Sequence, residues 1–81
     1  MGISETTYLR LPELGEGIEK ATIACWHVQP GQRVQQDDDI VELVTDKAAF
    51  NVTAERDAVV TAILVPEGQE AKVGQPLAVL G

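Results

Sequence analysis

Residues 40–52 have the sequence Ile-Val-Glu-Leu-Val-Thr-Asp-Lys-Ala-Ala-Phe-Asn-Val. Two apolar runs rich in β-branched or aromatic residues, 40–44 and 49–52, flank the four residues 45–48. Asp is favoured in tight turns because its carboxylate can bond the backbone two residues further on. The stretch therefore predicts a β-hairpin in which Asp46 fixes the turn and Lys47 projects from the tip.

The rest of the chain shows short β-type runs separated by turn signals, and helical periodicity is weak throughout. We expect strands at 8–11, 21–28, near 34, at 59–65, near 71–73 and at 77–80. Residues 12–18 are expected to form a loop, and the turn signals are Pro30-Gly31, Pro66-Glu67-Gly68 and Gly74-Gln75-Pro76.

A repeat with an offset of 37 residues relates two halves of the chain. Without a gap, Ala21 falls on Ala58, Ile23 on Val60, Trp26 on Ile63, Val28 on Val65, Gly31 on Gly68, Gln32 on Gln69, Ile40 on Leu77 and Leu43 on Leu80. Such a repeat predicts an all-β flattened barrel or sandwich, in which two small antiparallel sheets pack about an approximate two-fold axis. Lys47 lies in the connection between the halves, so we expect the chain ends at the opposite pole.

Composition limits the classes of function that are open to the chain. Its 81 residues make one small domain, too short for an α/β catalytic domain, and the domain is expected at 8–81 after an N-terminal tail at 1–7. The net charge is −7 with six scattered basic residues, which argues against a nucleic-acid partner. No run approaches the roughly 20 apolar residues that span a bilayer.

Metal sites and membrane anchoring are also not expected. Cys25 and His27 are the only cysteine and histidine, and Asp37 to Asp39 lack the ligand spacing of a calcium loop. Both Cys25 and His27 are expected on the strand face opposite Trp26, a core anchor. Gly2 fits a loose N-myristoylation pattern, but no second membrane signal accompanies it. Without a targeting signal or paired cysteines, the chain is expected in a reducing compartment.

Two motifs carry a resemblance to a known family. Leu11-Pro12-Glu13-Leu14-Gly15-Glu16-Gly17-Ile18, followed by Thr45-Asp46-Lys47-Ala48, resembles the lipoyl domain of the acyltransferase component of 2-oxo acid dehydrogenase complexes. The Trp26 strand and the ending Val73-Gly74-Gln75-Pro76-Leu77 agree, so the resemblance covers residues 8–80. One departure is Val44, where the family usually carries Glu, and this changes the local charge.

The resemblance implies a barrel-sandwich hybrid fold and a carrier that is not itself an enzyme. Lys47 would carry lipoate in amide linkage, a swinging arm that moves acyl groups and reducing equivalents. The implied partners are a thiamine diphosphate-dependent decarboxylase, an acyltransferase core, dihydrolipoyl dehydrogenase and a lipoate-attaching enzyme. These enzymes would recognise Thr45, Asp46 and Ala48. They would also contact Glu13, Gly15, Glu16 and Gly17, which match a family loop that lies near the lysine hairpin. A monomer in a bacterial cytoplasm or a mitochondrial matrix is expected.

Four other kinds of protein are alternatives to a lipoyl domain of an acyltransferase. Biotin carriers share the hairpin lysine, but their pattern has a methionine on each side of it. In this chain Asp46 and Ala48 flank Lys47, and Met1 is the only methionine. The glycine-cleavage carrier protein also bears lipoate but is longer. A pure interaction module would show no covalent mass change. An acyltransferase catalytic domain needs a histidine-containing motif and far more length.

Overall fold

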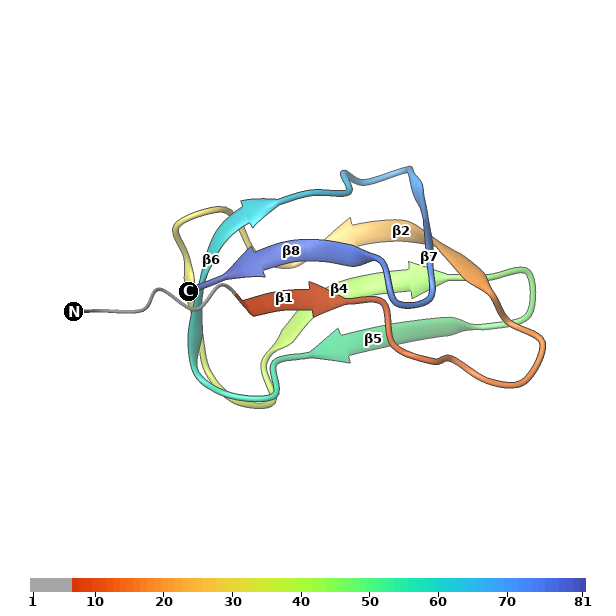
Figure 1. Ribbon diagram of the computed structural model, residues 1–81, viewed down its shortest axis with the longest axis horizontal. Helices are drawn as coiled ribbons and strands as arrows, with labels where there is room; N and C mark the ends of the chain where they lie inside the picture. The colour runs from red at the N-terminus through yellow and green to blue at the C-terminus, as the bar shows by residue number, and fades with distance from the viewer. Residues whose placement is uncertain (1–6) are drawn as a thin grey trace.

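A computed structural model describes residues 7–81 of the chain (Figure 1). These residues form eight β-strands joined by turns and loops. They are β1 (Thr7–Arg10), β2 (Lys20–Trp26), β3 (Arg33–Val34), β4 (Asp39–Val44), β5 (Ala49–Thr53), β6 (Ala58–Ile63), β7 (Glu70–Lys72) and β8 (Pro76–Leu80). The expected all-β class is confirmed, and each expected strand is present with its ends shifted by at most two residues. The question of acylation at Gly2 lies outside the described residues.

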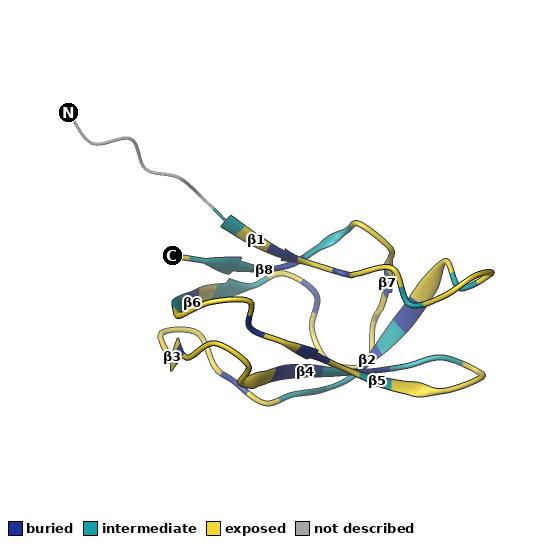
Figure 2. Ribbon diagram, turned by 90° about the horizontal axis from the view of Figure 1, so that it is seen from below, coloured by how far each residue is buried: buried dark blue, intermediate teal, exposed yellow. Residues whose placement is uncertain are grey.

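The strands form two four-stranded antiparallel sheets that face each other (Figure 2). The first sheet has the order β1-β8-β6-β3 and the second has the order β5-β4-β2-β7. Each sheet contains strands from both halves of the repeat, because β3 pairs with β6 and β7 pairs with β2. Neither half can therefore complete a sheet without the other.

The 37-residue repeat is visible in the backbone hydrogen bonds. Gly31 N–H donates to Val60 O at 2.6 Å, and the equivalent Gly68 N–H donates to Ile23 O at 2.8 Å. The irregularities repeat as well, since the register of β2 shifts between Ile23 and Cys25 and that of β6 shifts between Val60 and Ala62. These bulges let apolar residues three apart, such as Ile23 and Trp26, both reach the interior. The expected quasi-two-fold arrangement is confirmed.

The core lies between the two sheets and is entirely apolar. Its largest fully buried side chains are Leu11, Ile23, Val34, Ile40, Val41, Leu43, Val60 and Leu77. Each stabilises the fold by about 1.5–3 kcal/mol relative to an exposed position. Trp26 packs against this core, and its indole N–H donates to Val65 O at 2.9 Å. His27 is exposed as expected, whereas Cys25 is half-buried.

Within residues 7–81 there is no helix long and apolar enough to cross a bilayer. The same residues contain no group of three or more His, Cys, Asp or Glu side chains placed to hold a metal ion.

The two ends of the sandwich carry different features (Figure 1). At one end Thr7 pairs with Leu80, so the first and last strands lie side by side there. The equivalent strand pair in the other sheet is β5 with β4, and the turn that joins these strands lies at the opposite end. The symmetry thus places residues 45–48 at the end opposite Thr7 and Leu80, the first and last strand residues, as expected.

Five turns share one backbone geometry. Each is closed by a backbone hydrogen bond from its fourth residue to its first, and each has a positive φ at its third residue. The third residues are Gly17, Gly31, Asp37, Gly68 and Gly74. Asp37, with φ 72°, is equivalent to Gly74, with φ 87°, so one copy of the repeat uses a side-chain-bearing residue where the other uses glycine. Aspartate tolerates this conformation better than most residues.

This pair of equivalent turns allows a matched stability test. A Cβ at Gly74 would meet no atom within 4 Å, so Gly74→Ala changes only the backbone conformational energy. We expect Gly74→Ala to lower the free energy of unfolding by about 1–2 kcal/mol. Asp37→Ala should cost less, because the native residue already bears a Cβ. Urea denaturation of both variants measures this, and equal losses would contradict it.

Candidate functional site

Lys47 lies at the tip of the β4–β5 hairpin. Val44 and Ala49 are the last paired residues of the two strands, and Leu43 and Phe50 form the pair below them. Leu43 is fully buried and Phe50 packs against the core, so the hairpin is anchored almost up to its tip. Asp46, Lys47 and Ala48 are all exposed. The primary amine is therefore presented on a short, exposed turn with a stiff two-stranded support.

The turn is held by Thr45, which corrects the expectation that Asp46 fixes it. Thr45 N–H donates to Ala48 O at 2.8 Å, and the Thr45 hydroxyl accepts from the N–H groups of Lys47 at 3.2 Å and Ala48 at 3.1 Å. The hydroxyl lies 3.2 Å from Ala48 O and can donate to it. None of these bonds involves the Asp46 carboxylate, and Asp46 is exposed.

The loop between β1 and β2 lies beside the lysine turn. A hollow of about 270 Å³ separates them, lined by Gly17, Ile18, Glu19, Lys20, Thr45, Asp46 and Lys47. Of the four loop residues expected near Lys47, the structure brings only Gly17 into this hollow. Glu13, Gly15 and Glu16 are exposed on the same loop but do not line it.

Three residues beside the lysine turn were missed from the sequence. Ile18 is half-buried in the hollow, Glu19 lines it, and Lys20 begins β2 there. Lys20 pairs with Glu70 of β7 at 3.6 Å, with both side chains about 60% exposed. Two apolar residues, Leu14 and Ile18, in a loop that is otherwise rich in Glu and Gly were the available signal that the loop folds back onto the domain. The Lys20–Glu70 pair depends on β7 crossing to β2 and has no local signal.

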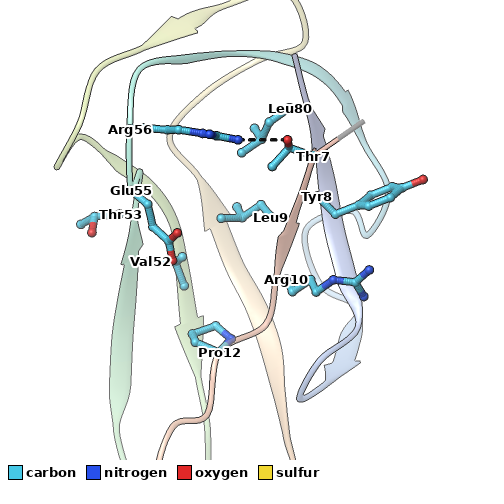
Figure 3. A pocket seen from close by; sticks show the side chains of 10 residues that line it. All are labelled: Thr7, Tyr8, Leu9, Arg10, Pro12, Val52, Thr53, Glu55, Arg56 and Leu80. Carbon is cyan, nitrogen blue, oxygen red and sulfur yellow. Dashed lines mark hydrogen bonds between the residues drawn. The ribbon is translucent and has the colours of Figure 1, made fainter. Parts of the chain in front are cut away.

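A larger hollow lies elsewhere, between the edge strands β1 and β5 (Figure 3). It measures about 480 Å³, and its lining includes Leu9, Val52 and Leu80. Arg56 donates to the Thr7 hydroxyl at 3.1 Å across one end, and Figure 3 shows the Tyr8 ring turned outward. No residue of the lysine turn lines this hollow, so it is separate from the site built around Lys47.

The fold and the exposed lysine define a class of protein, the cofactor-carrying domains. A family model described as "Biotin-requiring enzyme", covering biotin- and lipoyl-attachment domains, matches residues 7–80. The chain belongs to this family, and the family match supports a carrier and not an enzyme.

Comparison with solved structures and curated relatives defines the family more closely. The lipoyl domain of the 2-oxoglutarate dehydrogenase complex from Azotobacter vinelandii superposes with a TM-score of 0.75 at 36% identity, covering 91% of this chain and 94% of that domain. The chain is a lipoyl domain of the kind found in dihydrolipoamide acyltransferases. A long-chain acyl-CoA carboxylase shares the fold, with a TM-score of 0.77 at 21% identity over 93% of this chain and 7% of that one.

The curated relatives are much longer than this chain. The succinyltransferase component of the 2-oxoglutarate dehydrogenase complex from Staphylococcus saprophyticus is 42% identical over 73 residues, 90% of this chain. The lipoamide acyltransferase component of the branched-chain complex from Bacillus subtilis is 36% identical over 75 residues, 93% of this chain. The chain spans 17% of the length of each relative.

The hydrogen bonding of the turn makes a direct prediction for Asp46. Because its carboxylate takes no part in closing the turn, Asp46→Ala should change the free energy of unfolding by less than about 0.5 kcal/mol. Chemical denaturation measures this, with Asp38→Ala as the contrasting variant. Asp38 accepts a hydrogen bond from Gln35 N–H at 2.8 Å, so removing its side-chain oxygens should be the more costly. A larger loss for Asp46→Ala than for Asp38→Ala would show that the Asp46 carboxylate does hold the turn.

Proposed function

We infer that the domain carries lipoate in amide linkage on Lys47. The observation that supports this most strongly is the placement of an exposed lysine on the turn opposite the chain termini. A domain tethered by its termini would point this end away from the tether and toward other enzymes.

The residues present fit this group. Lys47 is exposed and forms no salt bridge within residues 7–81, where Lys20 with Glu70 is the ion pair found. Its amine is therefore free to attack an activated carboxyl group, forming an amide and releasing the activating group and a proton. A narrow hairpin tip can enter a deep active site that a flat surface could not. When bound, lipoate supplies a dithiolane that accepts an acyl group and two electrons.

The proposed role is that of a swinging arm in a 2-oxo acid dehydrogenase complex, by likeness to the relatives. Lipoate on Lys47 would visit a thiamine diphosphate-dependent decarboxylase, an acyltransferase core and dihydrolipoyl dehydrogenase in turn. Tethering to such a core converts diffusional encounters into local ones and raises the effective concentration of the arm. The bacterial cytoplasm or the mitochondrial matrix is the proposed compartment, and the domain itself is proposed to be monomeric.

Recognition is proposed to use the surface around Lys47. Asp46 and Ala48 flank the lysine on the turn, and Gly17 faces it across the hollow, with Glu13, Gly15 and Glu16 exposed on the same loop. Amide formation removes the positive charge of Lys47 and so makes this end more acidic. Basic rims on partner enzymes would attract it, and added salt would weaken the attraction.

The attachment site is tested by intact mass after incubation with lipoate, ATP and a lipoate–protein ligase. We expect one lipoyl adduct on the native chain and none on Lys47→Arg, which keeps the charge and the fold but offers no primary amine. Lys20→Arg and Lys72→Arg are the matched controls, because both lysines are exposed on the second sheet, and each should still gain one adduct.

The other outcomes distinguish the alternatives. Biotin on Lys47 in cells supplied with both cofactors would replace lipoate as the cargo. No adduct of either kind on the folded native chain would favour a pure interaction module. Loss of folding in Lys47→Arg, seen by circular dichroism, would show that Lys47 is structural.

A further inference from the structure

The lysine turn is built differently from the five turns described above. Those turns close through a backbone hydrogen bond from the fourth residue to the first and place a positive φ at the third. In the lysine turn the third residue is Lys47, which has no positive φ, and the fourth is Ala48. Ala48 N–H donates to the Thr45 hydroxyl and not to the Thr45 carbonyl.

In this turn a single side-chain oxygen, that of Thr45, takes the place of the backbone carbonyl that accepts the closing hydrogen bond in the other five. The Thr45 hydroxyl accepts from both Lys47 N–H and Ala48 N–H and lies within donating distance of Ala48 O. A hydroxyl has two lone pairs and one hydrogen, so these three contacts use its full capacity. Lys47 and Ala48 are exposed, so no core packing replaces the contacts if the oxygen is removed. Only the Thr45 N–H bond to Ala48 O would remain.

We propose that Thr45 is the positioning residue for modification of Lys47, acting through its hydroxyl on the backbone of the turn. This inference rests on the proposed lipoylation of Lys47. The hydroxyl fixes the amide of Lys47 itself, which sets the direction in which the lysine side chain leaves the hairpin. A modifying enzyme must receive the amine in one orientation, and a turn that samples other conformations presents that orientation for only part of the time.

The test compares Thr45→Val, which keeps the branched shape without the hydroxyl, with Thr45→Ser, which keeps the hydroxyl. Lipoylation of each 81-residue chain by a lipoate–protein ligase is followed by intact mass under steady-state conditions. For Thr45→Val we expect kcat/KM to fall about tenfold through a higher KM, because a smaller competent fraction weakens apparent binding. Thr45→Ser should restore the native value. Thr61→Val is the matched control, since the Thr61 hydroxyl also bonds a backbone carbonyl, Val79 O at 3.0 Å, but in the other sheet.

A second readout separates positioning from direct recognition of the hydroxyl by the enzyme. In the unmodified protein, ¹⁵N relaxation order parameters of Lys47 and Ala48 should drop in Thr45→Val from about 0.85 toward 0.6, while those of the sheets stay unchanged. Slower modification without this local change would overturn the proposal, as would Thr45→Val being modified at the native rate. Thr45→Ser behaving like Thr45→Val would overturn it too. If the native chain gains no lipoyl group, the proposed function has failed, whereas a defect confined to Thr45→Val tests the positioning alone.

Discussion

The exchange of the short strands β3 and β7 between the two halves is the constraint on which the structure depends. Each half of the repeat contributes a short strand to the sheet of the other, so the apolar faces are completed together. Gly31 and Gly68 make equivalent hydrogen bonds where the chain crosses over. Because the two sheets are equivalent, the β8–β1 junction and the β4–β5 hairpin must occupy opposite ends.

This symmetry places two features of the small domain at opposite ends: the pairing of the first and last strands, and the exposed lysine turn. One end receives the chain termini, where Thr7 pairs with Leu80, and the other presents Lys47. The core needs no polar group, and residues 7–81 bury no polar or charged side chain. Rigidity therefore comes from apolar packing beneath the hairpin, and the turn above it is exposed. The turn itself is then governed by local hydrogen bonds, chiefly those of Thr45.

Much of the site could be predicted from the sequence because its signals are local. The apolar run at 40–44, the turn residues at 45–48 and the run at 49–52 predict a hairpin with Lys47 at its tip. The choice of Asp46 as the turn-fixing residue was wrong, because Thr45 and Asp46 are both good turn formers and the backbone geometry selects between them. The loop at 12–18 was expected near the lysine, and only Gly17 reaches the hollow beside it.

The sequence by itself determined the strands, the repeat, the exposed lysine and, through two motifs, the family. These features depend on residue type and short-range order, which a single chain displays directly. Only the tertiary structure decided that Ile18, Glu19 and Lys20 lie beside the lysine turn, and that Lys20 pairs with Glu70. It also decided that one hydroxyl holds the turn together. The Lys20–Glu70 pair depends on strand exchange between the halves, whereas the role of the hydroxyl depends on the backbone geometry of the turn, which is set when β4 and β5 pair.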